Sequence, residues 1–263
     1  MAHLMADVEA CARLLADLRR DRRQIDALPE ELAPADLAEG YAVQDQLSRL
    51  LGQRVLGWKV AATNDAAQRG LGVAEPFSGR LLDGAIDASP AAVAPSLLPG
   101  RPLLECEVGL RLAAPLRPEG APCTREQAAG CVGAAVACFE LPGSRFTSLG
   151  GVGAPSLVAD NAVAARLVAG PDVAYDPGMD LAAIGVRLHV NGEVLAEGIG
   201  ATVLGDPLNS LVWLADHLAA RGLWLETGAL VSTGALTGLH ALRPGDHARA
   251  EFTGLGTIEV TFA

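Results

Sequence analysis

The stretch "PLLECEVGLRL", residues 102–112, places two acids inside an apolar run. If it is a strand, its side chains alternate between two faces, with Leu104 and four further apolar residues on one and Glu105 and Glu107 on the other. The two carboxylates then lie about 6.6 Å apart along the strand and repel each other unless something intervenes. Two interpretations follow: a solvent-facing polar face with Arg111 as a partner, or a site for a divalent cation such as Mg²⁺ or Mn²⁺.

Two further ionisable residues adjoin apolar runs. Glu140 closes the stretch "GAAVACFE". An acid in that place is often only a boundary marker, but a third oxygen ligand from another element is also what an octahedral site needs. Lys59 lies between Trp58 and Val60. It is either an edge-strand lysine with a packed stem or a desolvated lysine that donates a proton or binds an anion.

The composition limits the classes of partner. The chain has 263 residues, enough for one large domain or one with a small appendage. Half of the residues are hydrophobic but only 4% are aromatic, so we expect a core built mostly from Ala, Leu and Val. The formal net charge is −11 without a basic patch, which argues against nucleic acid and anionic membranes as partners. An anionic substrate stays compatible, because a bound cation inverts the local field.

The sequence favours a cytoplasmic location. No apolar run reaches the roughly 18 residues of a membrane span. Residues 1–23 lack the early positive charge and apolar block of a secretory signal, and their apolar spacing is that of an amphipathic helix. The five cysteines are scattered, without a CxxC pair, so they predict neither a zinc ribbon nor a disulfide framework.

The order of the predicted elements favours an α+β fold. We expect helices over 6–23 and 35–53, a strand over 54–63, a loop-rich segment over 64–100, a strand over 103–112, and over 126–141 a helix or a helix followed by a strand. Then follow a hairpin over 182–198 that turns at Asn191-Gly192, a helix over 205–222 and strands over 229–236 and 247–263. This is not the alternating βαβ order of a doubly wound sheet. We place a boundary near residue 75, between a helical N-terminal part (1–75) and the main body (76–263).

Common catalytic motifs do not account for these residues. The stretch "GIGATVLG" has Val203 where GxGxxG requires glycine, and neither GxSxG nor HExxH occurs. Four of the five histidines lie late in the chain, from His189 onward. The acids and Lys59 therefore remain the candidate site.

Several segments, taken in order, resemble a known family. They are "AEGYAVQDQL", "GWKVAAT", "PFSGRLLDG", "ECEVGLRL", "FELPGSR", "VADNAVAA", "GIGATVLGDPLNSLVWLADHLAARG" and "STGALTG" followed by "RPGD" and "EFTGLGTIEVTF". Each is weak alone, but their order and spacing are specific and cover nearly the whole chain. The sequence resembles the 2-keto-4-pentenoate hydratase/4-oxalocrotonate decarboxylase group of the fumarylacetoacetate hydrolase superfamily.

The resemblance implies a fold and a set of site residues. It implies a mixed β-roll or barrel body with a helical N-terminal part, and a cofactor that is Mg²⁺ or Mn²⁺. It assigns the residues as follows: metal ligands Glu105, Glu107 and Glu140; the catalytic lysine Lys59; substrate-binding residues Asp160, Asn161, Ser232, Thr233 and Thr237. It thereby favours the metal interpretation of the two strand acids.

The implied reaction is the hydration of a short 2-hydroxy-dienoate in aromatic compound catabolism, by a hydro-lyase. The metal of such enzymes chelates the carboxylate and the 2-oxo oxygen of a small 2-oxo acid and stabilises the enolate. Carbon–carbon hydrolysis ranks lowest, because hydrolases of the superfamily use a histidine in the N-terminal half, and this chain has none between His3 and His189. We expect a homo-oligomer, and the resemblance admits association with a related pathway enzyme.

Three departures from the family pattern keep alternatives open. Gly143 and the segment around Phe77 lack acids that the family carries, and Ala235 stands where serine is common. These changes leave that end of the pocket less charged if the two segments line it. A 4-oxalocrotonate-type decarboxylase and a non-catalytic partner subunit of the same fold therefore remain the alternatives to the hydratase.

Overall fold

The structure, a computed structural model, describes residues 7–118, 120 and 122–263. Within these residues the strands form two sheets. The first has the order β2-β1-β11-β5-β6-β7-β3, with β12 beside β5 and β8 beside β6. Its strands are β1 (Val55–Ala61), β2 (Phe77–Leu82), β3 (Ile86–Ala88), β5 (Leu103–Leu112), β6 (Val132–Leu141), β7 (Arg166–Ala169), β8 (Val173–Ala174), β11 (Leu230–Ala235) and β12 (His240–Ala241). The second sheet has the order β10-β9-β13-β14-β4, and its strands are β4 (Ala91–Val93), β9 (Gly185–Val190), β10 (Glu193–Ile199), β13 (His247–Phe252) and β14 (Gly256–Phe262).

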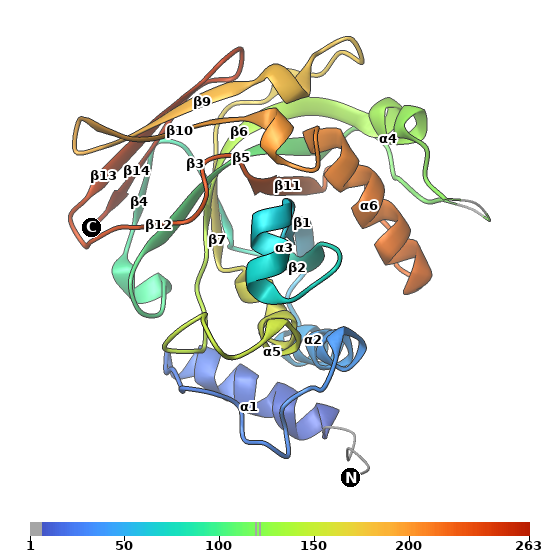
Figure 1. The fold of residues 1–263 in the computed structure, drawn as a ribbon, viewed down its shortest axis with the longest axis vertical. Coiled ribbons are helices and arrows are strands. Elements are labelled where there is room, and N and C mark those ends of the chain that lie inside the picture. Colours follow the sequence, from blue (N-terminus) through green and yellow to red (C-terminus); the bar gives the residue numbers. More distant parts are fainter. Residues whose placement is uncertain (1–6, 119, 121) are drawn as a thin grey trace.

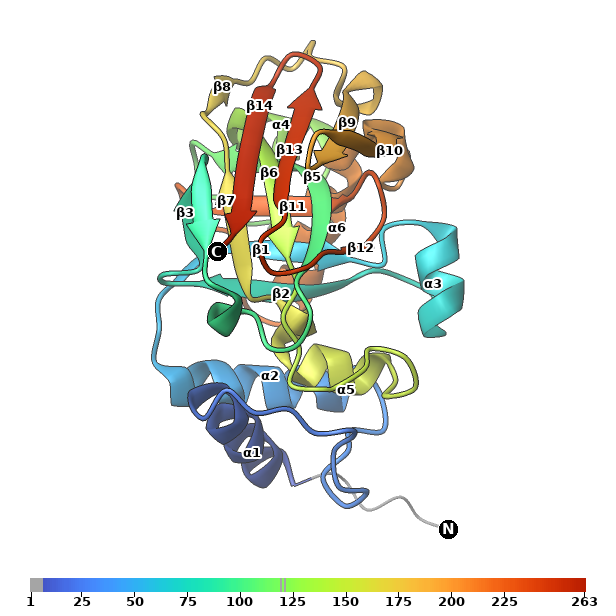
Figure 2. The same cartoon turned by 90° about the vertical axis from the view of Figure 1, so that its left-hand side faces the viewer.

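Six α-helices accompany the sheets in the described part of the chain. They are α1 (Val8–Arg20), α2 (Leu37–Leu51), α3 (Asp65–Leu71), α4 (Arg125–Cys131), α5 (Ala154–Ala159) and α6 (Pro207–Ala220). Figures 1 and 2 show α1, α2 and α5 grouped at one end of the molecule, beyond the sheets, and Figure 2 shows α3 projecting at the side. None of these helices has the length and apolar character needed to cross a bilayer. The mixture of helices and sheets confirms the α+β prediction.

Strand β5 runs through the middle of the larger sheet. It covers residues 103–112, as predicted, and pairs antiparallel with β11 and β6. Its apolar face is fully enclosed, because Leu104, Cys106, Val108 and Leu110 have no exposed surface. This face belongs to a core cluster that includes residues of both sheets and is mostly Leu, Val and Ala, as the composition predicts.

The predicted N-terminal helices are confirmed. Asp7 caps α1, and α2 ends at Gly52, whose positive φ of 62° suits glycine. The helices enclose a second core cluster with α5. Residues 1–6, which contain His3, lie outside the described residues. The boundary near residue 75 stays a prediction; β1 precedes it, yet it pairs with β2 and β11 in the larger sheet.

The prediction of a loop-rich segment over 64–100 is wrong. It contains α3, β2, β3 and β4. The helix α3 is a single short element with no buried residue, so it shows no inner apolar stripe. All six positions of β2 are buried, so the strand shows no alternation of polar and apolar residues. Contacts distant in sequence, above all the pairing of β2 with β1, decide this segment.

Other elements follow local signals. Residues 126–141 hold a helix and then a strand, the second of the two alternatives. The hairpin turn at Asn191-Gly192 has the expected positive φ values of 51° and 88°, and Asp206 caps α6. The single strand predicted over 247–263 is in fact the hairpin β13–β14. Its turn, residues 253–255, contains Gly254, and β14 begins at Gly256; both glycines have positive φ, because such turns need residues that tolerate the left-handed region.

Candidate metal centre

Three carboxylates converge at one end of the β5–β6 pair. Glu105 and Glu107 project from β5, and Glu140 lies directly opposite Glu105 in the antiparallel register. One ligand oxygen from each residue can be chosen such that all three lie within 4.8 Å of one another. The sheet register, which joins residues 35 positions apart, therefore builds a three-carboxylate cluster from two neighbouring strands.

The cluster is enclosed. Glu107 is 1% exposed and Glu140 is not exposed at all, while Glu105 is half-buried. Burial raises the pKa of Glu107 to about 7, and the neighbouring charge of Glu105 adds to the effect. Burial also raises the pKa of Glu105 and of Glu140. The solvent-facing interpretation therefore does not hold for Glu107, and Arg111 pairs with Asp172 rather than with either acid.

The donor set fits a divalent cation. Both carboxylate oxygens of Glu140 are buried without a hydrogen-bond partner. The Glu107 Oε2 atom accepts hydrogen bonds from Ser232 Oγ at 2.6 Å and from the Gly234 N–H at 2.7 Å, which orient that carboxylate. The Glu140 Oε2 atom lies 3.4 Å from the Lys59 ammonium, but a buried anionic oxygen without a hydrogen bond, such as Glu140 Oε1, is costly, and carboxylate oxygens are the ligands that Mg²⁺ and Mn²⁺ prefer. The assignment of these three residues as metal ligands stays a prediction that this geometry supports.

Lys59 belongs to the same cluster. Strand β1 lies between β2 and β11, so the edge-strand interpretation is wrong. The residue is 3% exposed, and its Nζ atom lies 3.4 Å from Glu140 Oε2. Burial acts to lower the pKa of Lys59, but the charges of Glu140, Glu105 and Glu107 outweigh it and the pKa is raised. Lys59 is therefore a buried ammonium group held by carboxylates.

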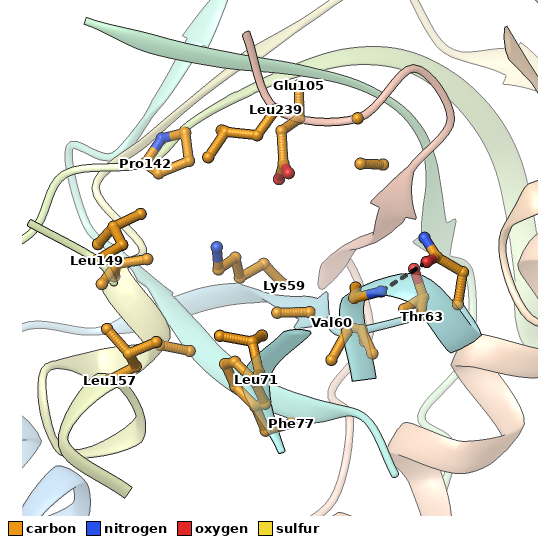
Figure 3. A pocket seen from close by; sticks show the side chains of 18 of the residues that line it. Lys59, Val60, Thr63, Leu71, Phe77, Glu105, Pro142, Leu149, Leu157 and Leu239 are labelled. Atoms are coloured by element: carbon orange, nitrogen blue, oxygen red, sulfur yellow. Dashed lines mark hydrogen bonds between the residues drawn. The ribbon is translucent and has the colours of Figure 1, made fainter. Parts of the chain in front are cut away.

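A cavity of about 500 Å³ opens beside the cluster. Lys59 and Glu105 reach into it, and Figure 3 shows both side chains facing the same space. Most of the remaining lining is apolar, with Thr63 and Asn64 as neutral polar members. Sequence reasoning missed Thr63, Asn64 and the apolar lining, because leucines and phenylalanines that line a cavity have the same local signal as those of a core.

Two of the predicted substrate-binding residues, Ser232 and Thr233, lie on β11, and Thr237 follows that strand. Ser232 and Thr233 are fully buried; Ser232 donates to Glu107, and Thr233 Oγ1 donates to the Val108 carbonyl. Thr237 is half-buried, with its hydroxyl 3.5 Å from the Gly238 carbonyl. The cavity is lined instead by their neighbours Ala235, Gly238 and Leu239. Direct substrate contact by Ser232, Thr233 and Thr237 stays a prediction.

The structure does not bring Asp160 and Asn161 to the cavity lining. Asp160 is fully buried and accepts hydrogen bonds from Arg19 and from the backbone and side chain of Arg145. The Asn161 side chain bonds the backbone of Arg80 through both its oxygen and its nitrogen. Asp160 thus connects its segment to Arg19 and Arg145, and Asn161 connects it to the backbone of Arg80. Their role as substrate-binding residues stays a prediction.

The two segments that lack the family acids differ in position. Phe77 lines the cavity, whereas Gly143 does not, although Pro142 beside it does. A Cβ atom added at Gly143 would lie 2.8 Å from the Ala165 Cβ and 3.1 Å from Pro99 Cδ. The backbone at Gly143 therefore leaves no room for a larger side chain unless its neighbours move.

Comparisons with known proteins agree with this geometry. Residues 61–263 match the family described as fumarylacetoacetate (FAA) hydrolase, C-terminal. The chain is 32% identical to 2-keto-4-pentenoate hydratase of Paraburkholderia xenovorans (strain LB400), over 97% of this chain and 94% of that protein. It is 30% identical to 4-oxalocrotonate decarboxylase of Pseudomonas putida, over 92% and 98%. The solved structure of 4-oxalocrotonate decarboxylase from Pseudomonas putida G7, complexed with magnesium and adipate, is similar with a TM-score of 0.90, 29% identity and 97% coverage of both chains.

Proposed function

The chain belongs to the fumarylacetoacetate hydrolase family, and from this premise we propose that it is a metal-dependent hydro-lyase that hydrates a 2-hydroxy-2,4-dienoate. The observation that carries the proposal is the enclosed cluster of three carboxylates and one ammonium group at the edge of an apolar cavity. Two nearly full-length relatives are a hydratase and a decarboxylase, both of which act on small 2-oxo acids or their enols.

Glu105, Glu107 and Glu140 would hold the cation, as Mg²⁺ or Mn²⁺. When bound, it supplies positive charge for the substrate carboxylate and for the 2-oxo oxygen, where negative charge develops in the enolate. Ser232 and the Gly234 N–H orient one of the three carboxylates, a supporting contact of the kind that fixes ligand geometry at metal sites.

Lys59 supplies the proton chemistry in this proposal. Its Nζ atom carries a proton inside the cavity, within 3.4 Å of Glu140 and beside the space that the carbon chain of the substrate would occupy. Protonation of 2-hydroxypenta-2,4-dienoate at C5 with loss of the C2 hydroxyl proton gives the conjugated 2-oxo-3-enoate, and addition of water across C3=C4, with OH on C4 and H on C3, gives 4-hydroxy-2-oxopentanoate. The apolar lining keeps bulk water away from the enolate and leaves the charged groups concentrated at one end.

A 4-oxalocrotonate-type decarboxylase is the second candidate. The similarity to the decarboxylase bound to magnesium and adipate favours it, since adipate carries two carboxylates. The reaction needs a cation for the distal carboxylate. Among the described residues that line the cavity, Lys59 is the sole cationic side chain, and it already lies beside Glu140. We therefore rank hydration first.

The test is a reaction assay on Mg²⁺-loaded protein. We expect the protein to consume 2-hydroxypenta-2,4-dienoate, which is measured as loss of the conjugated ultraviolet band. In a separate assay, we expect it to release no CO₂ from 2-oxo-3-hexenedioate. Lys59→Met should lower kcat by about 100-fold or more, the scale of a lost acid–base group, and the metal affinity measured by calorimetry should persist. CO₂ release without dienoate turnover would establish the decarboxylase, and no turnover of either acid would favour a non-catalytic subunit.

A further inference from the structure

One side of the cavity is apolar and uncharged. We call it the apolar wall and define it by Leu71 of α3, Phe77 of β2, Leu149 of the loop after β6 and Leu157 of α5. Figure 3 shows Leu71, Phe77 and Leu157 across the cavity from Glu105, and Leu149 at its side, level with the Lys59 ammonium. A substrate whose carboxylate end lies at the glutamates therefore directs its other end toward the apolar wall.

The charges of the lining distinguish the two ends. Among the described residues around the cavity, the charged members are Glu105 and Lys59, both at the cluster end. The apolar wall contributes four hydrocarbon side chains, none of which can donate a hydrogen bond to an anion. An ionised carboxylate placed there would lose its water without gaining a partner, which is a large penalty. An alkyl or aryl group placed there would gain hydrophobic stabilisation.

The size of the cavity exceeds that of a five-carbon substrate. 2-Hydroxypenta-2,4-dienoate has eight non-hydrogen atoms, which fill no more than about 240 Å³ even at the ~30 Å³ that a whole water molecule occupies in the liquid. The cavity holds about 500 Å³. Space thus remains for atoms beyond C5, and the apolar wall lines part of the cavity.

We infer that the protein selects a monocarboxylic 2-oxo acid, or its enol, that carries an apolar tail beyond C5, and that it discriminates against 2-oxo dicarboxylic acids. The inference rests on the proposed function, because the glutamate cluster must anchor the carboxylate end. Leu149 and its partners in the apolar wall are then the specificity-determining residues.

A binding experiment tests this without turnover. Calorimetry on Mg²⁺-loaded protein would compare the affinities for 2-oxopentanoate, 6-methyl-2-oxoheptanoate and 2-oxoadipate. The last two acids have similar shapes, because 2-oxoadipate carries a carboxylate where 6-methyl-2-oxoheptanoate carries an isopropyl group. We expect 6-methyl-2-oxoheptanoate to bind at least 10-fold more tightly than 2-oxopentanoate, since each buried methylene contributes about a four-fold change. We expect 2-oxoadipate to bind at least 10-fold more weakly than its isopropyl counterpart.

A variant supplies the reverse test. Leu149 is half-buried in a surface loop, so Leu149→Arg can be tolerated and introduces a cation at the apolar wall. We expect it to tighten 2-oxoadipate about 10-fold and to weaken 6-methyl-2-oxoheptanoate. The matched control is Leu195→Arg, the same substitution at a residue that is 47% exposed on β10, outside the cavity lining. The control should leave all three affinities unchanged.

The outcomes separate the two proposals. If 2-oxoadipate binds as tightly as 6-methyl-2-oxoheptanoate, or if Leu149→Arg changes neither, this inference is wrong while the proposed function stands. If the acids bind in the expected order but no dienoate is turned over, the proposed function is wrong and the apolar selection stands. If none of the three acids binds, both are wrong.

Discussion

At the scale of single residues, Asp160 connects the helical part of the chain to the walls of the cavity. It caps the end of α5 and has no exposed surface. Its carboxylate lies 3.0 Å from Arg19 Nη2 of α1, and it accepts a 2.7 Å hydrogen bond from the Arg145 backbone N–H as well as contacts from the Arg145 guanidinium. One buried acid therefore compensates two buried or nearly buried cations.

Removing that charge should cost much stability. We expect Asp160→Asn to lower the free energy of unfolding in urea by about 3–5 kcal/mol, because the two guanidinium groups keep their desolvation cost without a counter-charge. The control is Asp172→Asn, which breaks the exposed pair with Arg111 and should cost less than about 1 kcal/mol. Equal losses would contradict this role. A raised KM at unchanged stability would instead support the predicted substrate contact of Asp160.

At the scale of elements, the close approach of β1 and β11 positions Lys59 beside the glutamates. The two strands pair in parallel, with Gly57 opposite Leu230 and Lys59 opposite Ser232. A Cβ atom at Gly57 would lie 2.0 Å from the Leu230 carbonyl oxygen. Only glycine allows the strands to approach this closely, so a residue two positions from Lys59 determines where the ammonium lies.

Substitutions of two glycines should therefore have opposite effects. Gly57→Ala should destabilise the protein by about 3 kcal/mol or more, since the methyl group meets backbone that cannot rotate away, and it should also lower kcat through Lys59. Gly70→Ala, inside α3 with nothing within 4 Å of its added Cβ, should gain about 0.5–1 kcal/mol. Urea unfolding of both variants measures the difference. A neutral Gly57→Ala would show that the strands can separate at no cost.

At the scale of the whole molecule, folding places three carboxylates and one ammonium group in a shared, enclosed space. The formal sum of these four charges is negative, and burial already raises the pKa of each glutamate. Without a cation, repulsion among the three glutamates therefore destabilises the folded state. A bound cation relieves this repulsion and makes the stability of the fold depend on metal concentration.

This coupling predicts that the wild type and Glu107→Gln exchange their order of thermal stability when Mg²⁺ is added. At 100 times its Kd, Mg²⁺ should stabilise the wild-type chain by about 2.7 kcal/mol, which corresponds to a rise in Tm of about 5–10 °C. Glu107→Gln should melt above the wild type in metal-free buffer, because repulsion with Glu105 is relieved, and below it when Mg²⁺ is added. Glu197→Gln, at an exposed residue of β10, should leave the Mg²⁺ response intact. Parallel metal responses of Glu107→Gln and the wild type would contradict the assignment of Glu107 as a ligand.

Much of the fold follows from local signals in the sequence. The alternation within residues 102–112 predicted β5, the segment 205–222 was predicted as a helix and contains α6, and Asn191-Gly192 predicted the β9–β10 turn. The spacing of Glu105 and Glu107 allowed a cation site as one of two interpretations, and the family resemblance favoured it. These features depend on neighbours within a few residues, so periodicity and capping chemistry are sufficient to predict them.

Only the tertiary structure decided the rest. Glu107 and Glu140 are buried together with Lys59. The segment predicted to be loop-rich contains α3 and β2, and Asp160 does not line the cavity. The apolar wall joins four elements between residues 71 and 157 that carry no common motif. The physical reason is that burial, pairing register and cavity shape depend on contacts between residues distant in sequence, and no local pattern records them.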